Sequence, residues 1–387
     1  MTERAYLDWN ATAPLRQEAR AAMMDALTRA GNPSSIHAEG RAARYLVERA
    51  RGQVAALAGV DPADVTFTSS GTEANALALS PAWSAEPGAG PWQRLVVSAI
   101  EHPSVLQGGR FDADRISRVA VSPGGMVDLD ALRAALRSGR PALVSVMLAN
   151  NETGAIQPVH EVADIVHQAG GLLHVDAVQG PGRIDCDINR LGADFLAVSA
   201  HKFGGPKGAG ALIRRAGLHL ADPLIRGGGQ ERGLRAGTEN AAAIAGFGAV
   251  CEAARLGLRP DAAHMLRLRE RLETGLRAAT PDIVIFGEAG PRLPNTTAFS
   301  LSGLRAETAI IALDLAGVAV SSGSACSSGK VQPSHVLEAM GVEPSLSRGA
   351  IRVSTGPETR DEDIERFLNA WIKLSESLLK GRTVIAA

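Results

Sequence analysis

The sequence predicts an α/β protein in which a mainly parallel sheet is flanked by helices and accompanied by a smaller α+β domain. Three observations lead to this prediction. The chain has 387 residues, more than one hydrophobic core usually holds, so a large domain and a smaller one are expected. Up to about residue 260, short apolar runs alternate with helix-like stretches, as in parallel sheets covered by helices. Beyond that point the segments become longer and amphipathic.

Buried strands are predicted wherever short runs of Val, Leu, Ile and Phe occur. Five such runs lie at residues 65–68, 95–100, 143–148, 172–176 and 195–199. Helices are predicted between them, for example over 41–57 and over 159–169, where Pro158 and Gly170 act as start and stop signals. The Pro- and Gly-rich stretch 81–91 is predicted to be a surface loop rather than a linker.

The chain is predicted to have three parts. Residues 1–15 form an N-terminal segment that joins the small domain, residues 16–260 form the large domain, and residues 261–387 form the small C-terminal domain. The elements expected in the last part are a long amphipathic helix, a strand over 283–286, a helix near 307–315 and a final helix from 361 to about 379.

Composition and charge favour a soluble enzyme. The chain is 45% hydrophobic and 21% charged, with a formal net charge of -1, so nothing electrostatic favours nucleic acid or an anionic membrane as a partner. Residues 1–4 carry charges where a secretory signal would be apolar, and the longest apolar stretches, such as 142–148, are too short to span a bilayer. We therefore expect a cytoplasmic protein.

The three cysteines, Cys186, Cys251 and Cys326, are odd in number and far apart. They form neither a disulfide framework nor a paired set of zinc ligands, so no intrinsic metal site is expected. The chain also has no H-E-x-x-H, C-x-x-C or G-x-S-x-G motif. Residues 323–331 resemble a P-loop only superficially, because the glycine spacing is one residue too long and Val331 stands where a hydroxyl residue would bind magnesium.

Polar residues collect directly after the five apolar runs. In open parallel sheets, ligands bind beyond the carboxyl ends of the strands, so these positions are the first to inspect. The runs end in, or are followed by, Ser69-Ser70-Gly71-Thr72, Glu101-His102, Asn150-Asn151, Asp176 with Gln179, and Ser199-Ala200-His201-Lys202. Five adjacent strand ends would thus offer a phosphate cradle, an imidazole, an amide, a carboxylate and an amine.

Each of these groups also has an ordinary structural interpretation. The residues 69–72 are compatible with a simple helix cap as well as with a helix N-terminus that holds a phosphate. Taken alone, His102 is compatible with a loop histidine and Asp176 with a surface charge. Their joint placement favours a site, because pyridoxal phosphate requires two protein groups: a carboxylate that keeps its pyridine nitrogen protonated and a lysine that forms a Schiff base.

Residues 199–208, Ser-Ala-His-Lys-Phe-Gly-Gly-Pro-Lys-Gly, closely resemble the cofactor-lysine motif of class V aminotransferase-fold enzymes, and specifically of the cysteine desulfurases. Further signatures of that family follow in order from about residue 6 to 380: Y-L-D and N-A-T at 6–12, N-P-S-S and His at 32–37, F-T-S and G-T-E at 67–73, E-H at 101–102, N-N-E and Gly at 150–154, H-V-D-A and Gln at 174–179, G-G-G-Q-E and Thr at 227–238, S-G-S-A-C at 322–326, and I-R and Ser at 351–354. The resemblance implies fold type I of the pyridoxal-phosphate-dependent transferases, with the cofactor bound in the large domain.

The resemblance also implies roles for individual residues. Lys202 is similar to the Schiff-base lysine, Asp176 to the partner of the pyridinium nitrogen, and His102 to the histidine that stacks on the cofactor ring and assists proton transfer. The whole expected cofactor-binding set is Gly71, Thr72, His102, Asn151, Asp176, Gln179, Ser199, His201, Lys202 and Thr238. Thr238 is expected to reach the phosphate of the other subunit, which implies a homodimer with composite active sites.

Cys326 resembles the nucleophile of the family. It lies in a loop at about 321–331 that is made of small residues and contains two glycines, so the loop is expected to be flexible. The Ser-Gly-Ser-Ala-Cys form is similar to the group I enzymes that serve iron–sulfur assembly. Cys186 and Cys251 are expected to be buried packing residues.

The implied reaction converts L-cysteine to L-alanine and leaves the sulfur as a persulfide on Cys326, from which it passes to an iron–sulfur scaffold or another acceptor. Arg352 and Asn151 are expected to bind the substrate, since the guanidinium fork of Arg352 suits a carboxylate. Lys202 and His102 are the other expected catalytic residues. A contact between Cys326 and a nascent iron–sulfur cluster is left open.

Three alternatives stay open at this point: a selenocysteine lyase, another class V aminotransferase, and a noncatalytic scaffold for iron–sulfur assembly. A thiol in a loop of small residues argues against the aminotransferase, because transamination needs no thiol. The intact set of candidate catalytic residues argues against the scaffold. Residues 379–387 lack the longer tail that resembles the scaffold-docking end of housekeeping enzymes, so the sulfur acceptor is left open.

Overall fold

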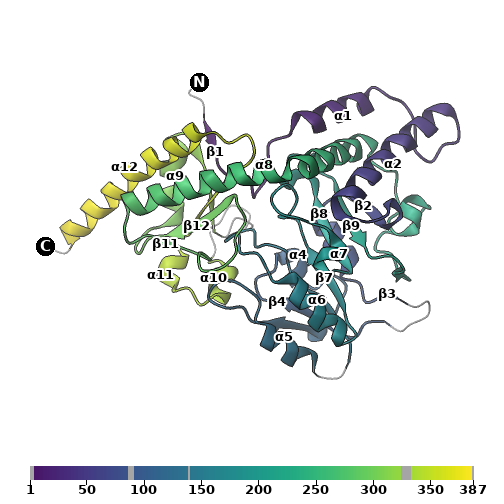
Figure 1. Cartoon of the computed structure of the whole chain (residues 1–387), viewed down its shortest axis with the longest axis horizontal. Helices are drawn as coiled ribbons and strands as arrows, with labels where there is room; N and C mark the ends of the chain where they lie inside the picture. Colours follow the sequence, from purple (N-terminus) through teal and green to yellow (C-terminus); the bar gives the residue numbers. More distant parts are fainter. Residues whose placement is uncertain (1–3, 86–90, 138–139, 324–332, 386–387) are drawn as a thin grey trace.

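The structure is a computed structural model that describes residues 4–85, 91–137, 140–323 and 333–385, with side chains up to residue 376. Figure 1 shows two groups of strands, each covered by helices, and one long helix, α8 (Ala241–Ala279), that runs alongside both groups. The larger sheet has seven strands and the smaller one has four.

The seven-stranded sheet contains all five predicted strands. Its order is β2 (Val65–Thr68), β9 (Gly210–Arg214), β8 (Phe195–Ser199), β7 (Leu172–Asp176), β6 (Leu143–Ser145), β4 (Leu95–Ser98) and β5 (Ile116–Val119). Neighbouring strands are parallel except at β9, which is antiparallel to both β2 and β8. The fold class predicted from the sequence is therefore confirmed.

Two strands of this sheet were not predicted, and both have physical reasons for being missed. β5 lies at the edge of the sheet and exposes Ser117 and Arg118, so it has no continuous apolar run. β9 begins with glycine and ends with arginine, which leaves only three apolar residues between them. The sequence predicts five adjacent strand ends. In the structure β9 lies between β2 and β8, so the end of β2 is separated from the other four.

Both faces of the large sheet are covered, which explains why its central strands are rich in apolar residues. Val96 and Val144 point into one core, shared with helices α2 (Ala38–Ala58), α5 (Leu129–Leu136) and α6 (Val159–Gln168). Their neighbours Leu95 and Leu143 point into a second core, on the side of helix α3 (Gly71–Ala78). Helices α1 (Gln17–Leu27), α4 (Pro103–Leu106) and α7 (Ile188–Leu191) complete this part of the chain.

The smaller sheet is built mainly from the C-terminal part of the chain. Its antiparallel order is β11 (Val284–Ile285), β12 (Thr296–Ser300), β15 (Ile351–Ser354) and β14 (Ser321–Ser322). Helices α9 (Ala306–Leu315) and α12 (Asp361–Ile385) enclose its core with the second half of α8. Two short helices, α10 (His335–Ala339) and α11 (Pro344–Ser347), precede β15. The N-terminal strand β1 (Ala5–Tyr6) pairs in parallel with β13 (Val318–Ala319) beside this sheet.

Helix α8 differs from the prediction, because it begins at Ala241 and passes through Pro260 without interruption. Residues 241–258 are apolar on almost every side, so they show no amphipathic period that would mark a helix. The predicted domain boundary at residue 260 falls inside this helix. By length and composition α8 could cross a membrane, but half of its most apolar window is buried in the protein, as in a core helix.

The stretch 81–91 also differs from the prediction in its described part. It contains a short strand, β3 (Trp83–Ser84), which pairs with β10 (His219–Leu220). Trp83 is fully buried, its ring centroid lies 4.8 Å from that of Phe195, and its indole nitrogen donates to the carbonyl oxygen of Leu77. This side chain fixes the segment onto the sheet, which loop composition alone does not reveal.

Candidate active site

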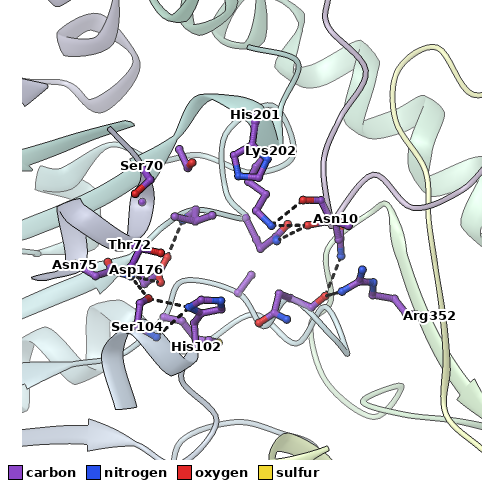
Figure 2. A pocket seen from close by; sticks show the side chains of 18 residues that line it. Asn10, Ser70, Thr72, Asn75, His102, Ser104, Asp176, His201, Lys202 and Arg352 are labelled. Carbon is purple, nitrogen blue, oxygen red and sulfur yellow. Dashed lines mark hydrogen bonds between the residues drawn. The ribbon is translucent and has the colours of Figure 1, made fainter. Parts of the chain in front are cut away.

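A cavity of about 230 Å³ opens beyond the carboxyl ends of the central strands, where the sequence predicted a site (Figure 2). It is lined by Asn10, Ala11, Ser70, Gly71, Thr72, Asn75, His102, Ser104, Met147, Ala149, Asn151, Asp176, Val178, Gln179, Ser199, His201, Lys202 and Arg352. The structure thus brings together residues from β7, from the loops after β2, β4, β6 and β8, from the N-terminal segment and from β15 of the small sheet.

The N-terminus of α3 forms one end of the cavity. Ser70 caps this helix, since its hydroxyl oxygen accepts a hydrogen bond from the backbone N–H of Glu73. A Cβ atom at Gly71 would lie 2.7 Å from Cγ2 of Val178 and 3.2 Å from Cβ of Ser199, so only glycine fits here. The helix cap and the anion-binding interpretation are therefore compatible, because the unpaired N–H groups of the first turn and the helix dipole favour a negative charge.

Lys202 enters the cavity from the short helical turn after β8. Its Nζ atom donates to the carbonyl oxygens of Asn10, at 2.8 Å, and Ala11, at 3.1 Å (Figure 2). The same carbonyl of Asn10 accepts a hydrogen bond from the side-chain amide of Gln179. The N-terminal segment therefore holds the amine of Lys202 in place at the edge of the cavity.

Asp176 and His102 lie on the side of the cavity opposite Lys202. A chain of hydrogen bonds through Asn75 and Ser104 links them (Figure 2). Asn75 donates through Nδ2 to Oδ2 of Asp176, at 2.8 Å, and to Oγ of Ser104, at 2.9 Å. Ser104 Oγ lies 2.7 Å from Nδ1 of His102. The second carboxylate oxygen of Asp176 accepts from the backbone N–H of Val178.

Burial lowers the pKa of His102 from its ordinary value. The positive charge of Lys202 and the proximity of His335 act in the same direction, while the carboxylate of Asp176 raises the pKa. The net shift is downward, so this imidazole is neutral at physiological pH.

Arg352 is almost completely buried and lines the cavity from β15. Its Nη1 atom donates to the carbonyl oxygen of Asn151, at 3.0 Å, and its Nη2 atom donates to Oδ1 of Asp8, at 2.7 Å. Its Nε atom has no hydrogen-bond partner within the described part of the chain. A carboxylate that entered the cavity would therefore meet a guanidinium group already oriented by two fixed acceptors.

The remaining predicted cofactor residues on the large sheet also line the cavity. His201 approaches Oγ1 of Thr12 through Nδ1, at 3.2 Å, and burial together with nearby Lys202 and Lys207 lowers its pKa to about 4. Gln179 accepts a hydrogen bond from Arg183 through Oε1. The predicted residues Gly71, Thr72, His102, Asn151, Asp176, Gln179, Ser199, His201, Lys202 and Arg352 are thus all found in one place.

One predicted site residue does not line this cavity, and another is not among the described residues. Thr238 is exposed in the segment before α8 and does not line the cavity of its own chain, so its expected role in another subunit stays a prediction. Cys326 lies outside the described residues. Cys186 and Cys251 are buried as expected, and burial raises the pKa of both thiols. Within the described ranges, no three His, Cys, Asp or Glu side chains gather so as to hold a metal ion.

Four polar residues at or beside the cavity were given no role by the sequence analysis. Asp8 and Asn10 belong to the N-terminal signature. They are far in sequence from the strand ends, so their contacts with Arg352 and Lys202 could not be predicted. Asn75 lies on α3 one helical turn after Gly71, a spacing that places both residues on the same side of the helix. Ser104 follows His102 by two residues, and its backbone N–H donates to Nδ1 of His102, a contact that the Glu-His motif does not reveal.

Known proteins with similar sequences and folds indicate which family has this arrangement of residues. The family model described as aminotransferase class V matches residues 5–367. A cysteine desulfurase of Cereibacter sphaeroides is 44% identical to the chain, over 97% of each sequence. The structure of a NifS-like protein from Rickettsia africae is similar with a TM-score of 0.88 and 35% identity, over 97% of this chain and 100% of that one. A structure of SspA in complex with cysteine is similar with a TM-score of 0.75 and 27% identity, over 92% of this chain and 100% of that one. With a family model that spans most of its length and a relative this similar over nearly all of it, the chain belongs to the class V aminotransferase family.

Proposed function

We propose that this chain is a pyridoxal-phosphate-dependent cysteine desulfurase, which converts L-cysteine to L-alanine and takes up the sulfur as a persulfide on Cys326. One observation carries the proposal: Lys202, Asp176 and the N-terminus of α3 open onto a single cavity, with Arg352 at its other side. The relative from Cereibacter sphaeroides, which is named a cysteine desulfurase, supports the choice of reaction. The cysteine bound to SspA supports the choice of substrate.

The residues of the cavity fit pyridoxal phosphate. The first turn of α3, at Gly71 and Thr72, together with Ser199 and His201, would hold the phosphate, because the N–H groups of a helix's first turn and the helix dipole favour an anion. Asp176 would hold the protonated ring nitrogen and Lys202 would bind the cofactor covalently. When bound, pyridoxal phosphate supplies an electron sink for the substrate carbon.

Arg352 and Lys202 would orient the substrate and move its proton. The guanidinium group of Arg352, held by Asp8 and the Asn151 carbonyl, would bind the carboxylate of cysteine. The amine of Lys202, which the carbonyls of Asn10 and Ala11 hold at the edge of the cavity, would take the proton from the α-carbon and return it later.

Cys326 would take the sulfur as a nucleophile. Its thiolate attacks the substrate sulfur, an S–S bond forms, the C–S bond breaks and the electron pair remains with the carbon skeleton, which takes up protons and leaves as alanine. An unperturbed thiol has a pKa of roughly 8.5, so only a few per cent is thiolate near neutral pH unless the site lowers that value. The other two cysteines are unsuited to this role because both are buried with raised pKa values.

We further propose a cytoplasmic homodimer that passes sulfur to an iron–sulfur scaffold or another acceptor protein. The exposed position of Thr238 supports a role across a subunit boundary, since this residue does not line the cavity of its own chain. The division into an N-terminal segment, a large domain and a small domain likewise stays a proposal. The pairing of β1 with β13 supports one feature of this division, namely that the N-terminal segment joins the small C-terminal domain.

The decisive experiment is an assay of alanine and sulfide formed from L-cysteine in excess dithiothreitol, with the visible spectrum recorded. We expect a yellow protein that forms both products in equal amounts. Cys326→Ala should keep the colour and form neither product, because the acceptor thiol is lost. Pyruvate or glutamate-linked products from a yellow protein would instead point to a lyase or an aminotransferase, and a colourless protein that binds no cofactor would point to a scaffold.

A further inference from the structure

The imidazole of His102 is held on one edge by Ser104. The backbone N–H of Ser104 donates to Nδ1 of His102, at 3.1 Å, and the hydroxyl oxygen of Ser104 lies 2.7 Å from the same atom (Figure 2). A backbone N–H can only donate, so Nδ1 must accept through its lone pair. A neutral imidazole whose Nδ1 accepts carries its proton on Nε2.

Asn75 and Asp176 fix the direction of the hydroxyl hydrogen bond from the other side. The carboxylate of Asp176 only accepts, so the amide nitrogen of Asn75, rather than its oxygen, must face it. Both hydrogens of that nitrogen are then used, one by Asp176 and one by the hydroxyl oxygen of Ser104. The hydroxyl proton of Ser104 is left to donate to Nδ1 of His102.

An unpartnered atom supports this direction. Oδ1 of Asn75 is buried and has no hydrogen-bond partner among the described residues. Turning the amide over would place this oxygen against the carboxylate of Asp176, where two acceptors would repel each other. The arrangement therefore leaves one buried oxygen unsatisfied, while the amide nitrogen of Asn75 donates both to Asp176 and to Ser104 and the Ser104 hydroxyl donates to His102.

We propose that Ser104 and Asn75 are positioning residues that hold His102 as a neutral imidazole, which acts in the cavity as a hydrogen-bond donor through Nε2 and not as a proton acceptor. The inference rests on the proposed function, since that function supplies the substrate or cofactor group that the donor would polarise. Accepting a proton at Nε2 would first require the existing proton to move to Nδ1, where the N–H of Ser104 already points. A neutral imidazole can polarise an acceptor without exchanging its proton.

The charged and titratable groups around His102 agree with this state. Lys202, from the turn after β8, and His335, from α10, both oppose a positive charge on the ring, as does burial. Asp176 at the end of β7 is the group that favours the charge, and part of its hydrogen-bonding capacity is taken by Asn75 and Val178. The pKa of His102 is lowered on balance, so the neutral form is maintained near neutral pH.

The tautomer can be measured without any turnover. In holoenzyme labelled with 15N-histidine, we expect Nδ1 of His102 to give an unprotonated resonance and Nε2 a protonated one between about pH 7 and 9. Ser104→Ala should move the Nδ1 resonance without protonating that atom, because one donor is lost while the backbone N–H remains. His37 is the matched control, since a backbone N–H also points at its Nδ1 atom, but its ring is exposed and lies far from Ser104 in the chain. Its resonances should be the same in Ser104→Ala as in the wild type.

Substitution of His102 itself separates a donor from a proton carrier. Glutamine keeps an N–H donor but cannot exchange protons, so His102→Gln should retain kcat within roughly tenfold of the wild type, while loss of general acid–base catalysis would cost about 10²–10⁴-fold. His102→Ala should be more severely impaired than His102→Gln, with cofactor absorption used to confirm that each variant is loaded.

A protonated Nδ1 near neutral pH, or a His102→Gln variant as inactive as His102→Ala, would overturn the inference. Failure of the proposed function has a different signature. In that case the wild type would form no alanine from cysteine, while the 15N pattern of His102 would still report the tautomer.

Discussion

The single residue on which the proposed chemistry depends most is Lys202, and two backbone carbonyls from a segment almost 200 residues away hold its amine. Neither carbonyl could be predicted from sequence patterns, because backbone acceptors leave no trace in residue types. The lysine itself could be predicted, since it follows an apolar run whose carboxyl end had to face the other strand ends. The same rule found Asp176 and His102.

Lys202→Ala should remove the visible absorption of the bound cofactor and all desulfurase turnover. The reason is that the substitution deletes both the covalent attachment and the amine that moves the α-proton. Absorption spectra and the alanine assay measure the two effects together. Lys207→Ala is a suitable control, because Lys207 follows in the same motif but does not line the cavity. A Lys202→Ala protein that stayed coloured and active would refute the assignment.

One thiol of the three should react in the folded protein. Cys186 is 2% exposed and Cys251 is 0% exposed, and burial raises both pKa values, so neither is available as a thiolate. Titration with a chromogenic disulfide reagent should therefore count one thiol per native chain, none in Cys326→Ala, and three in the unfolded wild type. Fast labelling of a second native thiol would contradict this account.

At the level of elements, periodicity predicted the buried strands well and the long helix poorly. The strands 65–68, 172–176 and 195–199 were predicted to the residue, because a strand covered on both faces is rich in apolar and β-branched residues. Helix α8 was predicted only from residue 261 onward, because its first half is buried on most sides and lacks a polar stripe. Strand β9 could not be ordered between β2 and β8, since strand order depends on contacts between segments far apart in sequence.

Helix α10 is tied to the loops of the large sheet by its first residues. Ser334 caps the helix and donates its hydroxyl proton to the carboxyl group of Glu152. The Nε2 atom of His335 lies 2.9 Å from the carbonyl oxygen of Glu101. Burial raises the pKa of Glu152 to about 7, although the hydrogen bond from Ser334 and the charge of Arg352 act against the shift. Ionisation of this carboxyl group near neutral pH therefore opposes the packing around α10.

The sign of this effect predicts how stability depends on pH. The folded-state pKa of about 7 is above the ordinary 4.5, so the contribution of Glu152 to stability is complete below pH 4.5 and is lost as the pH rises through 7. Glu152→Gln has no charge to bury, so it should gain stability relative to the wild type between about pH 5 and 8, by at most about 3 kcal/mol. The apparent melting temperatures of both proteins, at about pH 5 and at about pH 8, measure this gain.

The control for this measurement is Glu338→Gln, on an exposed position of the same helix. Its melting temperature should follow that of the wild type at both pH values. If the difference between Glu152→Gln and the wild type were the same at both pH values, the carboxyl group would not be titrating in the folded protein over this range.

At the scale of the whole molecule, the proposed homodimer can be tested by mixing inactive and weakened subunits. If Thr238 reaches the cofactor of its partner, Thr238→Ala homodimers should bind pyridoxal phosphate more weakly at both sites. A mixed dimer of Lys202→Ala and Thr238→Ala subunits should regain one site of wild-type affinity, because that site combines an intact Lys202 with an intact Thr238. Cofactor titration of the purified mixed dimer would show this site, and its absence would place Thr238 within its own subunit.

The contact between Asp8 and Arg352 joins residues that are 344 positions apart in the chain. During synthesis, at about 5–20 residues per second, Arg352 therefore leaves the ribosome roughly 20 to 70 seconds after Asp8. The first strand and the carbonyls that hold Lys202 belong to the same N-terminal segment as Asp8. The cavity can thus be completed only when nearly all of the chain has been translated, so a truncated or stalled product would carry the cofactor lysine but lack Arg352 on the other side of the cavity.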